Sequence, residues 1–162
     1  RAILQAQDGR GEVTQLTGMV LARLQVNTPP ELIDTIYDAP APQITIASLA
    51  DLVEAAAAQG DAIAQMILER AAHNLARMLQ AASDQLGEQA RPVPLVLAGS
   101  TILHGSLLAQ AFHQACAAAG MAFSSITPVP EPATGAVMLA KQVYQYRPRA
   151  EDSGAEHIES MF

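Results

Sequence analysis

The stretch VPLVLAGST, residues 93–101, places a glycine where an apolar segment ends and a helical pattern starts. Gly99 can form a tight turn there, or it can leave the main chain open to contact with a ligand. A turn at the carboxyl end of a parallel strand is where open α/β sheets bind ligands. The stretch is neither a P-loop nor a GxGxxG motif, so a plain turn glycine stays open as the alternative. The turn at Gly99 is therefore a candidate place for contact with a ligand.

Residues 92–146 predict a strand–helix–strand–helix order around this turn. Val93–Ala98 is a nearly continuous apolar run, which is typical of a strand buried on both faces. A helix is expected from about Ser106, a second strand over 123–127 and a last helix from about Thr134. Strand, helix, strand implies a parallel pair. Two parallel strands make no stable sheet alone, so further strands are expected from a partner or from a longer native chain.

Residues 1–91 predict helices, and residues 147–162 read as a polar tail. Asp61 is expected to cap the longest helix, because it directly precedes an amphipathic pattern. The segment Gln43–Ala47 alternates between polar and apolar residues and is the one weak strand candidate in this half. The apolar stripe expected to face the core from the longest helix consists of Ile63, Met66, Ile67, Ala71, Leu75, Met78, Leu79 and Ala82.

Composition excludes several classes of protein. The chain has 162 residues, of which 50% are hydrophobic and 15% charged, as in a globular domain. A net charge of −7 without a basic stripe argues against nucleic-acid binding. No apolar run reaches the roughly 18 residues of a membrane span, so a cytoplasmic protein is expected. A single cysteine, Cys116, excludes an internal disulfide.

Four stretches occur together in an order and spacing that resemble a known family. They are DGRGEVTQLT, ASLADLVEAAAAQGDAIAQMILERAAHNLARML, VPLVLAGSTILHGSLLAQAF and EPATGAVMLA. Together they resemble the C-terminal half of the N-acetylglucosamine kinases, within the BadF/BadG-type ATPases of the actin and hexokinase fold. The fold class implied is a mostly helical α/β protein, the C-terminal lobe fragment of an actin-like (ribonuclease H-like) ATPase with a short parallel strand pair. The start at Arg1, inside a helical pattern, agrees with a fragment.

The resemblance implies a nucleotide site built from two segments. In the family, the turn after LVLAG meets the adenosine side of the nucleotide, which assigns Gly99, Ser100 and Thr101 to that edge. An alanine just before the preceding helix lies against the adenine in the family, which assigns Ala47, with Ser48 beside it. A small side chain there leaves a flat slot for a purine, although an ordinary packing alanine is the alternative.

The resemblance also implies a hinge at Gly135 and Ala136, where helices of two lobes cross, although Gly135 also fits an ordinary first helical turn. The implied activity is Mg²⁺-assisted transfer of the γ-phosphate of ATP to the 6-hydroxyl of N-acetylglucosamine or glucosamine. The phosphate-binding hairpin and the proton-accepting aspartate of the family are absent, so no catalytic residue is assigned. This chain alone is expected to be inactive without an N-terminal lobe, and the resemblance implies a dimer.

Two other classes of function stay open. The first is a non-catalytic activator or regulator of the same fold that senses nucleotide. The second is a helical interaction module without a ligand, and such a module predicts no stabilisation by Mg-ATP.

Overall fold

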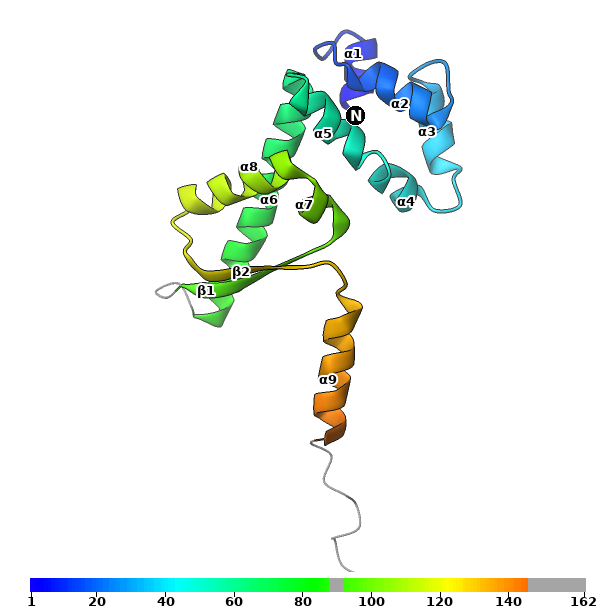
Figure 1. Cartoon of the computed structure of the whole chain (residues 1–162). Coiled ribbons are helices and arrows are strands. Elements are labelled where there is room, and N and C mark those ends of the chain that lie inside the picture. The colour runs from blue at the N-terminus through cyan, green and yellow to red at the C-terminus, as the bar shows by residue number, and fades with distance from the viewer. Residues whose placement is uncertain (88–91, 146–162) are drawn as a thin grey trace, which may run out of the picture. The chain divides into compact units, whose positions relative to one another are not determined.

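The computed structural model describes residues 1–87 and 92–145 and separates two compact units, Arg1–Pro130 and a unit that begins at Glu131 (Figure 1). The described part is a mostly helical α/β structure, as predicted. The elements of the first unit are α1 (Ala2–Gln7), α2 (Leu16–Leu24), α3 (Glu31–Tyr37), α4 (Pro42–Ala47), α5 (Ala50–Ala58), α6 (Ala62–Leu86), β1 (Val93–Ala98), α7 (Ser100–His104), α8 (Ser106–Ala118) and β2 (Phe123–Val129). The second unit contains α9 (Ala133–Gln145).

β1 and β2 form a parallel two-stranded sheet in the described part of the chain, as predicted from the strand–helix–strand order. β1 has the predicted bounds, and β2 extends two residues beyond the predicted end at Thr127. The expectation that β1 is buried on both faces is wrong. Leu95 is buried, whereas Val96 on the opposite face is 60% exposed. Side chains alternate between the faces of a strand, and the described residues of this unit cover one face only.

The core of the first unit is built on one face of α6, on which most of the buried residues are alanines. Ala64, Leu68, Ala72 and Ala76 are buried at four-residue spacing and pack with residues of α5 and α8. The predicted stripe is therefore displaced, because small side chains let α5 and α8 approach closely on the neighbouring face. Several residues of the predicted stripe are instead exposed, namely Met66, Ile67, Leu75 and Met78.

The N-terminal helices form a second, smaller apolar cluster. Val20 of α2, Leu32 of α3 and Leu52 of α5 are buried together. The weak strand candidate Gln43–Ala47 is wrong, because this segment belongs to helix α4. Pro42 occupies its first turn, where the fixed φ of proline favours a helix and its missing N–H costs no hydrogen bond.

Asp61 caps α6, as predicted, and also joins two distant parts of the chain. Its buried carboxylate accepts a hydrogen bond from the Ala64 N–H at 2.8 Å. It accepts two more from the segment before α2, from the Thr14 hydroxyl at 2.9 Å and from the Gln15 N–H at 2.6 Å. The cap therefore fixes the start of α2 to the start of α6.

The predicted boundary between the helical and alternating segments lies between residues 91 and 92, at the end of the range 88–91, and the predicted polar tail is 147–162. Both ranges lie outside the described residues, so this division of the chain stays a prediction. Within the described ranges, no helix combines the length and hydropathy that crossing a membrane requires.

Candidate functional site

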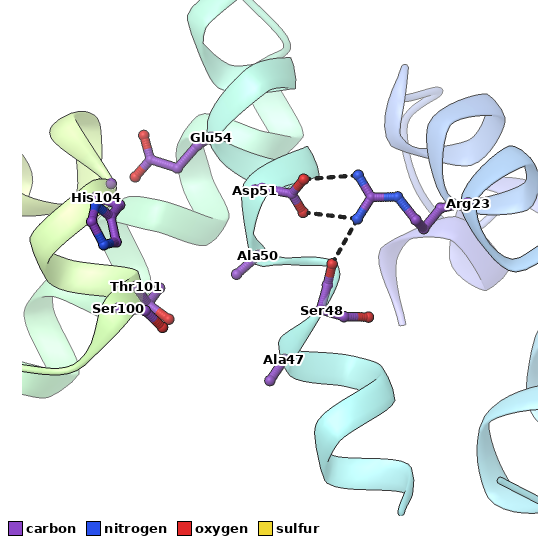
Figure 2. A pocket seen from close by; sticks show the side chains of 10 residues that line it. Arg23, Ala47, Ser48, Ala50, Asp51, Glu54, Ser100, Thr101 and His104 are labelled. Atoms are coloured by element: carbon purple, nitrogen blue, oxygen red, sulfur yellow. Dashed lines mark hydrogen bonds and ion pairs between the residues drawn. The ribbon is translucent and has the colours of Figure 1, made fainter.

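A pocket of about 410 Å³ lies between the turn that joins α4 to α5 and the short helix α7 (Figure 2). One wall comes from the end of α4 and the start of α5, and the other comes from α7 and the turn that follows it. The lining residues are Arg23, Ala47, Ser48, Ala50, Asp51, Glu54, Ser100, Thr101, His104 and Gly105.

This pocket brings together four of the residues proposed for nucleotide binding. Ala47 and Ser48 lie on one wall, and Ser100 and Thr101 lie on the other, although the two pairs are far apart in the sequence. Figure 2 shows Ala47 and the hydroxyl-bearing pair on opposite sides of the same space. No local sequence pattern predicts that these four residues lie at one pocket. Their role in binding stays a prediction.

Gly99 and the hinge candidates lie outside the lining of the pocket. Gly99 directly precedes Ser100 at the carboxyl end of β1 and serves as the N-cap residue of α7. Gly135 and Ala136 lie in the first turn of α9, in the second unit, and no observation in the structure tests the hinge.

The backbone at Gly99 explains why this position is a glycine. Its φ of +105° lies in a region that side-chain-bearing residues rarely adopt, and a Cβ there would have no atom within 4 Å. Glycine is therefore required by the backbone conformation rather than by a crowding neighbour, and the space beside the turn is open.

We expect Gly99→Ala to lower the free energy of unfolding by about 1–3 kcal/mol, the cost of holding alanine in that backbone region. Gly18→Ala is the matched control, because Gly18 lies inside α2 without a positive φ and a Cβ there also meets nothing within 4 Å. The control is expected to leave stability unchanged or raised. Urea unfolding of both variants measures the difference, and equal effects would contradict a strained turn at Gly99.

Arg23 holds the α4–α5 turn against α2, and sequence reasoning missed it. Its Nη2 donates to Asp51 Oδ2 at 2.8 Å, and its Nη1 donates to the Ser48 carbonyl oxygen at 2.9 Å (Figure 2). The hydrogen bond from Arg23 lowers the pKa of the Asp51 carboxyl, and Asp51 raises the pKa of the guanidinium. The guanidinium and the carboxylate are thus paired with each other. The bond from Arg23 to the Ser48 carbonyl holds the backbone of that pocket wall.

The two walls differ in chemistry. The methyl groups of Ala47 and Ala50 give an apolar surface on one side, and the hydroxyls of Ser100 and Thr101 give polar groups on the other. The Ser48 hydroxyl donates to the Thr45 carbonyl oxygen at 2.7 Å, so toward a ligand it acts as an acceptor. A pocket with small apolar groups on one side and hydroxyls on the other can accept a heterocycle with polar edges.

The sequence profile of the BadF/BadG/BcrA/BcrD ATPase family matches residues 1–140. The chain belongs to this ATPase family. It is also 35% identical over 102 residues to an N-acetylmuramic acid/N-acetylglucosamine kinase of Clostridium acetobutylicum, and the match covers 63% of this chain. The matched region is 33% of that kinase, so the match spans about a third of its relative's length. The resemblance stated from the four sequence stretches is confirmed.

Membership in an ATPase family implies ATP as a ligand. Among residues 1–87 and 92–145, no group of three or more histidine, cysteine, aspartate or glutamate side chains is placed to hold a metal ion. Asp51, which lines the pocket, is paired with Arg23. A purine site at this pocket stays a prediction, and a bound Mg²⁺ in the family's nucleotide complexes is not tested by this structure.

Proposed function

We propose that the pocket binds the adenosine part of ATP in an ATP-dependent amino-sugar kinase. The observation that carries this proposal is the meeting of Ala47 and Ser48 with Ser100 and Thr101 at one pocket, in a chain of an ATPase family. The similarity to a curated sugar kinase supports the phosphotransfer reaction.

Each wall has a defined role in this proposal. The methyl groups of Ala47 and Ala50 pack against one face of the purine, where larger side chains would fill the space. The hydroxyls of Ser100 and Thr101 form hydrogen bonds with polar edges of the nucleoside. Gly99 leaves the main chain beside them accessible, because no side chain stands between the backbone and the open space.

The proposed reaction moves the γ-phosphate of ATP to the 6-hydroxyl of an amino sugar. N-acetylglucosamine and glucosamine are the proposed acceptors, and the name of the kinase relative adds N-acetylmuramic acid as a further candidate. Mg²⁺ would neutralise charge on the phosphates. The phosphate-binding hairpin, the proton-accepting aspartate and most of the sugar site are proposed to belong to an N-terminal lobe of an actin-like fold. This chain alone is therefore proposed to be inactive.

Two further parts of the proposal concern the assembled protein. Closure of the two lobes about Gly135 and Ala136 would exclude water from the reacting phosphate. The protein is proposed to act as a homodimer in the cytoplasm.

A phosphotransfer assay of the full-length protein tests this function. The protein is incubated with Mg-ATP and, separately, with N-acetylglucosamine, glucosamine, N-acetylmuramic acid and glucose, and ADP and sugar phosphate are measured. We expect an amino sugar to be phosphorylated at the 6-hydroxyl and Mg-ATP to raise the melting temperature. Stabilisation by ATP without sugar phosphate would favour the nucleotide-sensing regulator, and no response to ATP would favour the interaction module.

A further inference from the structure

Glu54 connects the two walls of the pocket, and no local pattern in the sequence indicates this. It lies on α5, and its carboxylate reaches the first turn of α8. Glu54 Oε1 accepts a hydrogen bond from the Leu108 N–H at 2.9 Å, and Oε2 accepts one from the Leu107 N–H at 3.2 Å. The N-cap residue of α8 is Gly105, which has no side chain to cap the helix. Glu54 therefore acts as the cap of a helix far away in the sequence, and its negative charge faces the positive end of the helix dipole.

The turn between α7 and α8 is packed directly against this carboxylate. A Cβ at Gly105 would lie 2.5 Å from Glu54 Oε1 and 2.5 Å from the Thr101 carbonyl oxygen. Glu54, the turn and the last part of α7 are thus in close contact, and the glycine is what allows the approach. Because α7 carries Ser100 and Thr101, a residue of one wall lies against the end of the helix that forms the other.

The opposite wall is fixed to the same helix. Ala50 and Asp51 are in the first turn of α5, and Arg23 holds that end of the helix through its bonds to Asp51 and Ser48. Glu54 is one turn further along α5, so the helix carries both the apolar wall and the carboxylate that fixes α7 and α8. Glu54 therefore joins the helix of the apolar wall directly to the helix that follows the polar wall.

We propose that Glu54 is a positioning residue for nucleotide binding, which caps α8 from α5 and so holds the two walls of the pocket at the separation that a purine requires. This inference rests on the proposed function, because it assigns Glu54 to the same pocket. Glu54 is not a catalytic residue, since it acts through the turn between α7 and α8.

The test compares Glu54→Ala and Glu54→Gln in the full-length protein. Without the carboxylate, the arrangement that binds nucleotide is populated for only part of the time, and the apparent affinity falls by that fraction. We expect Glu54→Ala to raise the KM for ATP about tenfold, and to change kcat and the KM for the sugar by less than about twofold. Glu54→Gln keeps one oxygen acceptor for the Leu108 N–H. We therefore expect its KM for ATP to rise by about threefold, which is half of the tenfold effect on a logarithmic scale.

A matched control and a binding-independent readout accompany these variants. Glu69→Ala makes the same change at an exposed position of α6 outside the pocket, and it should leave the KM for ATP unchanged. Amide hydrogen exchange without nucleotide should be faster at Leu107 and Leu108 in Glu54→Ala, because their acceptor is gone. If Glu54→Ala does not fold, the smaller rise in KM of Glu54→Gln carries the test.

The outcomes separate this inference from the proposed function. If the wild-type protein binds ATP and folded Glu54→Ala has the wild-type KM for ATP, the positioning role is wrong and the proposed function stands. Where Glu54→Ala does not fold, a wild-type KM for ATP in Glu54→Gln has the same meaning. A fall in kcat at constant KM for ATP also overturns it, as does an equal effect of Glu69→Ala. If the wild-type protein does not bind ATP, the proposed function fails and the positioning role fails with it, even where exchange shows that Glu54 caps α8.

Discussion

Replacing Ala47 by phenylalanine is expected to raise the KM for ATP by about thirtyfold or more, a loss of about 2 kcal/mol of binding free energy. Ala47 is exposed and lies on the pocket wall that faces Ser100 and Thr101. A benzyl group there would occupy the space proposed for the purine. Because the position is not in the core, the variant should remain folded with a melting temperature close to that of the wild type. Steady-state kinetics with varied ATP measures the change.

Ala58→Phe is the control for this experiment. Ala58 is an exposed alanine at the end of α5, outside the lining of the pocket, so the same substitution adds the same apolar area without filling the space. Its KM for ATP should equal that of the wild type. A wild-type KM for ATP in Ala47→Phe would show that the nucleotide does not occupy this pocket.

Asp61→Ala is expected to lower the free energy of unfolding by about 3 kcal/mol or more, because buried donors lose a charged acceptor. The carboxylate accepts bonds from the Ala64 N–H, the Gln15 N–H and the Thr14 hydroxyl, and the side chains of Asp61 and Thr14 are buried. Urea unfolding measures the loss. Asp38→Ala, at an exposed aspartate after α3, should change stability by less than about 0.5 kcal/mol. Equal effects of the two substitutions would contradict the role of Asp61 as a buried junction.

The same residue predicts a pH dependence of stability. Burial acts to raise the pKa of Asp61, but hydrogen bonds from the Ala64 and Gln15 N–H groups and the Thr14 hydroxyl outweigh it and lower the pKa below the ordinary 3.8. The unfolded state then binds the proton more readily, so the stabilisation is complete above the ordinary pKa and is lost as the pH falls through the lower folded pKa. Unfolding measured from about pH 6 to pH 2 should show a weaker acid dependence in Asp61→Ala than in the wild type. The same acid dependence in both proteins would contradict this assignment.

The elements that sequence reasoning located correctly carry strong local signals. β1 is a continuous apolar run bounded by Pro92 and Gly99, and its predicted ends match the structure. The Asp61 cap also follows from its place before an amphipathic pattern. These signals need only neighbours along the chain, because a strand bounded by turn residues and a helix cap are both local structures.

The errors and omissions depend on distant contacts. The alternation of Gln43–Ala47 resembles a strand, but proline in the first turn and the absence of a pairing strand among the described residues leave a helix. The expected stripe of α6 consists of its larger apolar residues, whereas close packing selects the alanine face. Arg23 and Glu54 act on partners far along the chain, so no local spacing distinguishes them from ordinary surface charges.

A structure of the full-length protein with Mg²⁺ and a non-hydrolysable ATP analogue tests the central claim most directly. The account predicts that the adenine lies between Ala47 on one side and Ser100 and Thr101 on the other, with the backbone of Gly99 beside the nucleoside. An analogue bound elsewhere, with this pocket closed by side chains, would contradict it.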